Sequence, residues 1–276
     1  ELEIESLRFC SMANDEIAAI RYSITPLNFT GNVKFTPYLD ANVYNHDANY
    51  EEFFWEEDSH KVDVKKGYVC VKTKKTNFYV STAMRFSFWK KDELLDIHPN
   101  YSSKPFYVEN NFEHYLEKGV TYHLKKYVSI VSTLNHSEFS VIPRSINNVR
   151  DAYTTGFDPL ILDHIKAWGD IWEKADIQIS GDLAAQQGIR FNIFQLYQTY
   201  TGKNEKLNIG PKGFTGEKYG GATYWDTEAY CLPFYLKTSD PKVAKQLLVY
   251  RYNQLDKAIE NAQKLGFKNG AALYPM

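Results

Sequence analysis

The sequence predicts a chain whose first half is built from β-strands and whose second half is helical. Apolar and polar side chains alternate from Leu2 to about Thr133, and apolar residues recur at helical spacing after Pro143. Aromatic residues make up 16% of the 276 residues, and such side chains favour the pleated, half-buried surface of a sheet. We therefore expect several short strands packed as a β-sandwich and, after them, a set of helices.

Three local patterns predict the strands. Residues 18–24 and residues 78–88 both alternate, which predicts strands with one buried face. Residues 62–64 and 69–71 flank Lys65-Lys66-Gly67, which predicts a β-hairpin with the glycine in its turn. In the clearest strand, one row of side chains is expected to point toward a covering sheet: Phe78, Val80, Thr82, Met84, Phe86 and Phe88.

The second half predicts a linker helix and two further helices. Asp182 is expected to cap the second helix, and Asp240 with Pro241 predicts the start of a third, which ends at Gly266. The side chains at helical spacing in the linker are Leu160, Ile161, His164, Ile165, Trp168 and Trp172. Those of the second helix are Ile189, Ile193, Phe194, Leu196 and Tyr197, and those expected inward in the third are Leu247, Leu248, Leu255 and Ile259.

These patterns divide the chain into three parts. We expect a β-sandwich domain over residues 1–145, a linker helix region over residues 146–178 and a helical domain over residues 179–276. The length suffices for one large domain or two modest ones, so the size of the core does not limit either assignment.

Charge and cysteine content argue against several classes of function. The formal net charge of −2 argues against a nucleic-acid partner, which needs a basic face. No apolar run reaches the length of about 18 residues that a membrane helix needs. Glu1 heads a strand-like sequence rather than a signal peptide, so we expect a cytoplasmic protein. Cys10, Cys70 and Cys231 fit neither a disulfide framework nor a zinc site, and we expect reduced, mostly buried thiols.

The most informative segment runs from Gly210 to Glu228 and holds five of the 15 glycines. Glycine lets the backbone turn tightly and approach a ligand closely. Near its end, Trp225 offers a flat apolar face, and Asp226 can accept hydrogen bonds from hydroxyls or transfer protons. A flat face beside a carboxylate suits a sugar, so these two residues are the candidate binding pair. The alternatives are a helix cap at Asp226 and a core position for Trp225.

Three neighbouring side chains are candidates for a supporting role. Glu228 follows Asp226 by two positions, and residues i and i+2 do not share a helix face, so we expect Glu228 behind the site rather than as a catalytic acid. Tyr219 and Tyr224 are placed to rim a cleft, although core or surface packing explains them equally well. The histidines lack metal-ligand spacing and the glycines lack the spacing of a nucleotide phosphate loop, so neither ligand is expected.

Four parts of the chain, met in the same order, resemble the inverting disaccharide phosphorylases of glycoside hydrolase family 65. Residues 8–12 with 19–28 resemble the N-terminal sandwich domain, and residues 188–195 resemble the first barrel helix. Residues 210–228 resemble the sugar site, and residues 265–275 a stretch before a later barrel loop. The resemblance implies part of the sandwich, a linker helix and the first helices of an (α/α)6 barrel. It also implies an internal segment of a longer enzyme, truncated at both ends.

The resemblance implies cleavage of an α-glucosyl disaccharide, by preference maltose, into β-glucose 1-phosphate and glucose. Inorganic phosphate is then the co-substrate, no metal or organic cofactor is needed, and a homodimer is expected. Trp225 and Asp226 match the residues that contact the non-reducing glucosyl unit. No position matches the family's catalytic glutamate or its phosphate-binding residues, so we expect these beyond Met276 and the chain alone to be inactive. A family 65 hydrolase of trehalase type and a non-catalytic carbohydrate-binding fragment are the alternatives.

Overall fold

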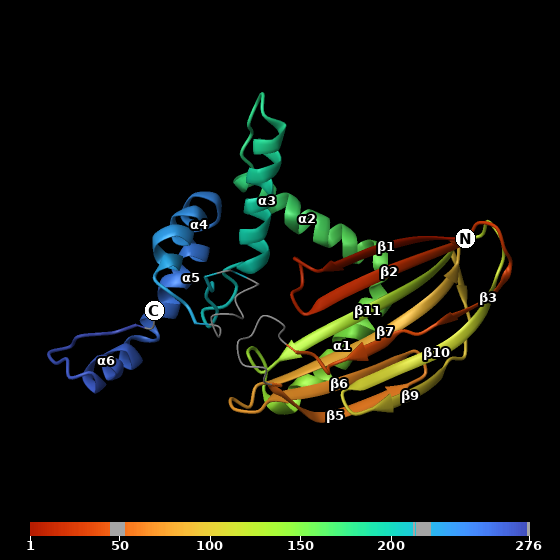
Figure 1. Ribbon diagram of the computed structural model, residues 1–276, viewed down its shortest axis with the longest axis horizontal. Helices are drawn as coiled ribbons and strands as arrows, with labels where there is room; N and C mark the ends of the chain where they lie inside the picture. Colours follow the sequence, from red (N-terminus) through yellow and green to blue (C-terminus); the bar gives the residue numbers. More distant parts are fainter. Residues whose placement is uncertain (45–52, 212, 214–221, 275–276) are drawn as a thin grey trace. The chain divides into compact units, whose positions relative to one another are not determined.

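The protein forms two compact units, as seen in the computed structural model of Figure 1. The sandwich unit holds residues 1–44 and 53–168, and the helical unit begins at Gly169. The boundary lies inside one helix, α2 (Phe157–Ala175), so helical backbone runs from one unit into the other. The structure describes residues 1–44, 53–211, 213 and 222–274.

Two antiparallel sheets form the β-sandwich in the described part of the sandwich unit, as the alternation predicts. The larger sheet has seven strands in the order β1, β2, β11, β7, β6 and β5, with β8 paired to β7. The smaller sheet has four strands in the order β3, β10 and β4, with β9 paired to β10. The larger sheet is formed by β1 (Leu2–Cys10), β2 (Ile17–Pro26), β5 (Trp55–Asp63), β6 (Lys66–Thr73), β7 (Tyr79–Lys90), β8 (Glu93–Leu95) and β11 (Tyr122–Ser132). The smaller is formed by β3 (Gly31–Phe35), β4 (Tyr38–Asp40), β9 (Asn100–Lys104) and β10 (Tyr107–Leu116).

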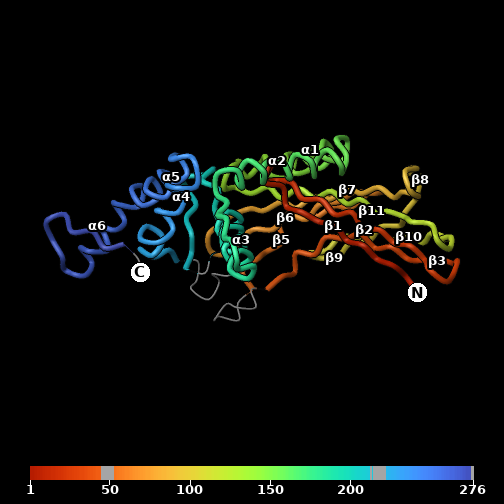
Figure 2. Tube along the Cα trace, turned by 90° about the horizontal axis from the view of Figure 1, so that it is seen from above, coloured from red at the N-terminus to blue at the C-terminus, as the bar shows by residue number. Residues whose placement is uncertain are grey.

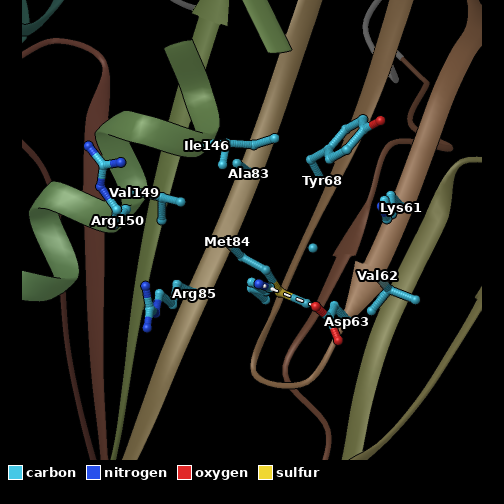
Figure 3. Close-up of a pocket in the computed structure, with 12 residues that line it drawn as sticks. Lys61, Val62, Asp63, Tyr68, Ala83, Met84, Arg85, Ile146, Val149 and Arg150 are labelled. Atoms are coloured by element: carbon cyan, nitrogen blue, oxygen red, sulfur yellow. Dashed lines mark ion pairs between the residues drawn. The ribbon is translucent and has the colours of Figure 1, made fainter. Parts of the chain in front are cut away.

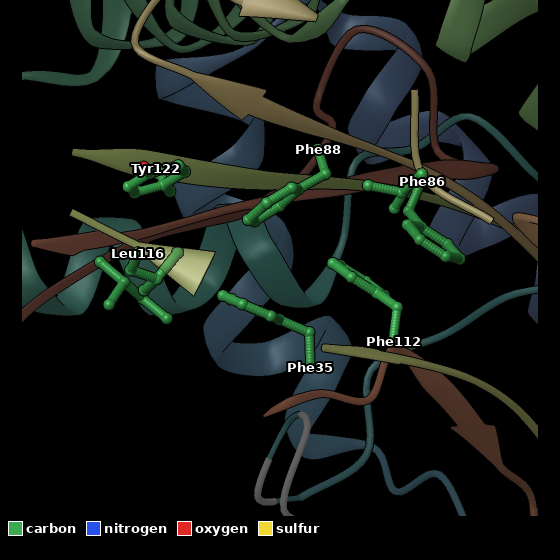
Figure 4. Packing of buried hydrophobic residues seen from close by; sticks show 8 residues of the cluster. Phe35, Phe86, Phe88, Phe112, Leu116 and Tyr122 are labelled. Atoms are coloured by element: carbon green, nitrogen blue, oxygen red, sulfur yellow. The ribbon is translucent and has the colours of Figure 1, made fainter. Parts of the chain in front are cut away.

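A largely aromatic core fills the space between the two sheets. Strand β7 turns Phe88 toward the smaller sheet, where its ring centroid lies 4.8 Å from that of Phe35 and 5.1 Å from that of Phe112. Full burial of one such side chain stabilises the fold by about 1.5–3 kcal/mol, so this cluster, shown in Figure 4, is a main source of stability. Its buried members are Ile24, Phe35, Phe86, Phe88, Ile97, Phe112, Leu116 and Tyr122.

Phe78 does not belong to the buried row, contrary to the prediction. Strand β7 begins one residue later, and Phe78 is 49% exposed. Its backbone closes a turn instead: the Thr73 N–H donates to the Phe78 carbonyl at 3.0 Å, and the Phe78 N–H donates to the Thr73 hydroxyl at 2.9 Å. Because these bonds fix the backbone in a turn, the side chain does not follow the pleat of the strand.

The predicted hairpin forms between β5 and β6, but its glycine is not in the turn. Val64 and Lys65 make the turn, and Lys65 takes the left-handed backbone conformation, with φ of 63°. Gly67 lies in β6, where a Cβ atom would come within 3.1 Å of the Lys61 carbonyl oxygen and 3.2 Å of Val108 Cγ2. The close approach of the smaller sheet, to which Val108 belongs, therefore favours glycine at this position.

Helix α1 (Glu138–Thr155) covers the outer face of the larger sheet, as Figure 2 shows. Ala83 of β7 packs there against Val149 of the helix. The helical period was predicted to begin after Pro143, but this proline lies inside α1. Proline removes the hydrogen bond to the carbonyl four residues back. That carbonyl belongs to Phe139, a residue that is 89% exposed, so water can replace the lost donor.

The predicted linker consists of two helices rather than one. Gly156, with φ of 88°, ends α1, and α2 follows directly. All six side chains that predicted the linker lie in α2. One of them anchors the helix to the sandwich, because His164 Nδ1 accepts a hydrogen bond from the Met12 N–H at 3.2 Å.

Both predicted helix caps form in the helical unit. The Asp182 carboxylate accepts a hydrogen bond from the Ala185 N–H at 2.9 Å, and the Asp240 carboxylate accepts one from the Lys242 N–H at 2.8 Å. After the end of α2, the described helices of this unit are α3 (Leu183–Thr199), the π-helix η2 (Thr227–Cys231), α4 (Leu232–Thr238), α5 (Pro241–Tyr252) and α6 (Leu255–Lys264).

The third predicted helix is broken into α5 and α6. The Gln254 N–H bonds to the Arg251 carbonyl only three residues back, at 3.0 Å, which tightens the backbone and ends α5. Leu247 is buried as predicted, whereas Leu248 is 52% exposed and does not face inward. The end near Gly266 is confirmed, since this residue follows α6 with φ of 87°.

The prediction of mostly buried thiols is wrong for one cysteine. Cys70 is buried and Cys231 is intermediate, but Cys10 is exposed. Cys10 ends β1, the edge strand of the larger sheet, where little packs against it. Burial, followed by the nearby Asp58, raises the pKa of the Cys70 thiol to about 12, so this thiol stays protonated at neutral pH.

We expect the sandwich unit to lose stability as the pH falls below about 6.5. Burial lowers the pKa of His114, His123 and His164 from the ordinary value of 6.5. In the acidic range the unfolded chain therefore binds more protons than the folded chain, so stability is present above the unfolded pKa and falls as these histidines protonate. Denaturant unfolding at about pH 7.5 and about pH 5.5 measures the difference.

A histidine substitution tests the cause of this pH dependence. His123→Gln keeps an amide that can bond to the Ser23 hydroxyl, now 2.8 Å from the ring nitrogen, and should reduce the loss at acidic pH. His98, whose side chain is 84% exposed, supplies the control, and His98→Gln should leave the loss unchanged. An identical loss in the His123→Gln variant and the unsubstituted chain would contradict the assignment to buried histidines.

Candidate functional site

Trp225 and Asp226, the predicted binding pair, lead directly into the π-helix η2. The first residue of η2, Thr227, is buried, and its hydroxyl donates to the Ile209 carbonyl at 2.8 Å. This bond fixes η2 to the residue that precedes the glycine-rich segment. A π-helical turn is rare and occurs frequently at functional sites, so the backbone geometry adds to the case for a site here.

One arginine of α5 holds the chain on both sides of the binding pair. Arg251 Nε donates to Glu228 Oε1 at 2.8 Å. On the other side, Arg251 Nη1 donates to the Thr223 hydroxyl at 3.1 Å and Nη2 donates to the Tyr224 carbonyl at 2.6 Å. The Arg251 and Glu228 side chains are only 14% and 24% exposed, so their ion pair is shielded from water. We call these four residues the Arg251 clamp.

The clamp leaves both members of the binding pair facing outward in the helical unit. Trp225 is 59% exposed, so it is not a core residue of the described chain. Asp226 is exposed as well, and its side chain makes no capping hydrogen bond to η2. The two alternative interpretations of this pair are therefore wrong for the described residues, and sugar binding stays the prediction for both.

Tyr230 places a second exposed ring beside Trp225. It is 69% exposed, and the two ring centroids lie 6.2 Å apart with an interplanar angle of 40°. Two adjacent aromatic faces next to the Asp226 carboxylate combine an apolar surface with a charged hydrogen-bond acceptor. Such an arrangement can contact the apolar face of a pyranose while the carboxylate accepts hydrogen bonds from its hydroxyls.

The predicted supporting residues fall into three situations. Glu228 is bound to Arg251, and its place behind a sugar site stays a prediction. Tyr224 supplies its carbonyl to the clamp. Tyr219 lies outside the described residues. Burial, and then the carboxylates of Glu228 and Asp226, raise the pKa of Cys231, so its thiol is not an activated nucleophile.

Arg251 was missed by the sequence reasoning, although a signal was present. Ala244 and Leu247 are buried on α5, and Arg251 continues the same face, because it follows Leu247 by four positions. A charged side chain on an inward helix face needs a partner, since an unpaired buried charge is strongly destabilising. This rule predicts a buried acid near Arg251 but does not say which one.

Glu228, the carboxylate two residues after Asp226, does not serve as a catalytic acid in this arrangement. Glycosidic cleavage needs a carboxylic acid that reaches the leaving oxygen, whereas Glu228 is bound in the clamp. Within the described ranges, no cluster of three or more His, Cys, Asp or Glu side chains could hold a metal ion. In the same part of the chain, no helix combines the length and the apolar character that crossing a membrane requires.

The fold and the site together define a class of protein in which a β-sandwich precedes a helical domain that carries a candidate sugar site. Residues 1–171 match the N-terminal domain of glycosyl hydrolase family 65, and residues 190–276 match the central catalytic domain of the same family. The chain belongs to glycosyl hydrolase family 65. Its sheets and helices are therefore the family's N-terminal β-sandwich and the beginning of its α/α barrel.

Individual relatives agree with this assignment. The chain is 42% identical over 275 residues to the maltose phosphorylase of Bacillus subtilis (strain 168), covering 100% of this chain and 36% of that protein. It is 33% identical over 286 residues to the α,α-trehalose phosphorylase of Thermoanaerobacter brockii, covering 99% and 36%. The solved structure of a candidate kojibiose phosphorylase from human microbiome superposes with a TM-score of 0.84 at 28% identity, covering 96% of this chain and 34% of that one.

We expect Arg251→Met to loosen the site and destabilise the helical unit by about 1.5–3 kcal/mol, because a shielded carboxylate and a carbonyl lose a charged donor. Amide hydrogen exchange of residues 223–231 should become faster, and denaturant unfolding should give the free energy. The matched control is Arg190→Met, which removes an equally short pair with Asp176, at 2.7 Å, in which the arginine is 49% exposed. That change should cost at most about 1 kcal/mol. Equal effects of the two substitutions would contradict a special role for the clamp.

Proposed function

We propose that this chain is part of an inverting disaccharide phosphorylase, which uses inorganic phosphate to cleave maltose into β-glucose 1-phosphate and glucose. The proposal concerns a larger protein, because the chain spans 36% of the length of the curated relatives it matches. The choice of maltose is supported by the relative of 42% identity, named maltose phosphorylase, whereas the trehalose phosphorylase is 33% identical.

The observation that carries the proposal is the outward Trp225–Asp226 pair, held from behind by Arg251. In the described chain neither side chain contributes to a core or a cap, so both stay available to a ligand. The clamp fixes their backbone at Tyr224 on one side and through Glu228 on the other. A rigid support of this kind lowers the entropy that a binding site loses when a ligand orders it.

In the proposed reaction the pair binds the glucosyl unit that is transferred. Trp225 abuts the sugar ring, and Asp226 accepts hydrogen bonds from its hydroxyls, each contributing about 1.5–3 kcal/mol. These bonds select glucose over its epimers, because a misplaced hydroxyl leaves a desolvated carboxylate without a donor. The Arg251 guanidinium takes no part in the bond changes and only positions the pair.

Phosphate replaces the water that an inverting hydrolase uses. A phosphate oxygen attacks the anomeric carbon from the face opposite the glycosidic oxygen, the carbon–oxygen bond breaks, and a carboxylic acid gives its proton to the leaving oxygen. Because no position of this chain matches the acid that the family resemblance implies, we assign that acid to another part of the protein. The homodimer and the cytoplasmic location expected from the sequence belong to the same proposal.

Asp226→Ala should abolish most of the phosphorolysis in a protein that carries this chain and the rest of the barrel. Loss of two charged hydrogen bonds corresponds to a fall in kcat/KM of at least about 100-fold. The assay is phosphate-dependent release of glucose 1-phosphate from maltose, with trehalose and kojibiose as competing substrates. Asp256→Ala is the control, because Asp256 is an exposed carboxylate on α6 outside the proposed site.

The outcomes separate the rival functions. Phosphate-dependent cleavage that is lost in Asp226→Ala and kept in Asp256→Ala supports the proposal, provided the circular dichroism of the three proteins agrees. Release of glucose without phosphate would instead indicate a hydrolase. Maltose binding without cleavage, in the longer protein, would indicate a carbohydrate-binding module. Unchanged turnover in Asp226→Ala would remove this residue from the sugar site.

A further inference from the structure

The sandwich unit contains a concave site, which we call the α1 pocket. It lies between helix α1 and the outer face of β5, β6 and β7, and its volume is about 280 Å³. Helix α1 packs mainly on β7 and β11, so the outer face of β5 and β6 beside it is left partly uncovered. Figure 3 shows Val149 and Arg150 of α1 on one side of the pocket, and Lys61 and Asp63 of β5 on the opposite side.

Strand register explains why charged and apolar side chains meet in this pocket. Lys61 pairs with Tyr68, and Tyr68 pairs with Ala83, which forms one row across three strands. Asp63, Lys66 and Arg85 form the next row in the same way. Both rows face α1, because Ala83 packs against that helix and residues two positions apart on a strand share a face.

The pocket has a marked excess of positive charge. Four cations line it, Lys61, Lys66, Arg85 and Arg150, but only one carboxylate, Asp63. Asp63 lies 3.2 Å from the Lys66 ammonium, and Asp151, next to the lining, lies 2.9 Å from the Arg150 guanidinium, which leaves an excess of two positive charges. A lysine on an edge strand also discourages pairing with other chains. That explanation covers Lys61 on β5 but not Lys66 and Arg85, which lie on interior strands.

The wall between the cations is apolar and partly aromatic. Tyr68, Ala83 and Val149 line the pocket, together with Ile146, an α1 side chain that is 41% exposed. Arg85 is held at one end, because its guanidinium carbon lies 4.1 Å from the ring centroid of Tyr153. Cations around an apolar wall that includes the Tyr68 ring fit an anionic ligand that also contains a ring.

We propose that the α1 pocket binds a sugar monophosphate. The cationic groups take the phosphate, since Arg and Lys are the side chains that bind phosphate oxygens most strongly, and Tyr68 with Ile146 contacts the sugar ring. The volume lies just below the usual range for small-molecule sites, so it suits a ligand no larger than a single phosphorylated monosaccharide. The site lies wholly in the sandwich unit, and it does not rest on the catalytic function proposed above.

Isothermal titration calorimetry with glucose 6-phosphate tests the proposal, because this ester is neither substrate nor product of the proposed phosphorolysis. We expect saturable binding of one ligand per chain, which weakens as salt is added. The double variant Lys61→Glu, Arg150→Glu should bind the ester at least about tenfold more weakly, because the two substitutions replace positive charges of the pocket with negative ones. Both residues are exposed, so the substitutions place no charge in a core. Lys118→Glu makes the same kind of change on an exposed loop outside the pocket and should bind normally.

Further titrations decide the ligand class and the location. Inorganic phosphate and glucose should each bind at least about tenfold more weakly than the ester if both parts of the pocket contribute, and Asp226→Ala should bind the ester unchanged. Binding of inorganic phosphate as tight as that of the ester would overturn the role of the apolar wall. Absence of binding, or equal binding by the double variant with an unchanged melting temperature, would overturn the site. If the chain alone binds the ester but a longer protein does not, another segment covers the pocket, and this result would also overturn the proposed site.

Discussion

The candidate sugar site depends on the hydrogen bonds of a single guanidinium. Arg251 reaches the carbonyl of Tyr224 and the carboxylate of Glu228, and the exposed Trp225 and Asp226 lie between these two points. Residues that must face a ligand cannot be fixed by burial, so their backbone has to be fixed from behind. Helix α5 sets the direction of this guanidinium. The Asp240 cap fixes the start of the helix, and the buried Leu247 fixes its inner face one turn before Arg251. In the proposed sugar site, specificity for a ligand at the surface thus depends on an ion pair that is shielded from water.

The larger sheet of the sandwich unit is used on both faces. Its inner face packs against the smaller sheet through a cluster of phenylalanines, and its outer face packs against α1. Strand β7 lies at the centre and is buried on both sides, whereas β5 lies at the edge and is covered mainly on its inner side. Helix α1 therefore covers only part of the outer face of the larger sheet and leaves β5 and β6 partly uncovered. The α1 pocket is the hollow that results, and its cations can stay charged there because water reaches them.

Sequence patterns predicted the elements better than their details. The presence of a strand at β7 and the caps at Asp182 and Asp240 depend on neighbours in the sequence, and these predictions were confirmed. The single buried face predicted for β7 is wrong, because α1 covers the second face and Phe78 lies outside the strand. Family resemblance, rather than periodicity, predicted the barrel. The sequence does not predict the place of Gly67 in β6, because one of the two atoms that crowd a Cβ there belongs to Val108, which is distant in the sequence. Arg251 was missed for the same reason, since its partners precede it by more than twenty residues.

The π-helical turn at Thr227–Cys231 holds one residue more than an α-helical turn would. Deleting any one of its residues would restore the α-helical repeat and rotate the preceding segment by roughly 100° relative to α4. Tyr235 would keep its hydrogen bond to the Leu196 carbonyl, now 2.7 Å long, while Trp225 would swing away from the clamp. The length of this turn is therefore constrained in addition to its anchoring side chains, Thr227 and Glu228. A descendant of this chain that kept both anchors but lost one residue of the turn would still lose the orientation of Trp225.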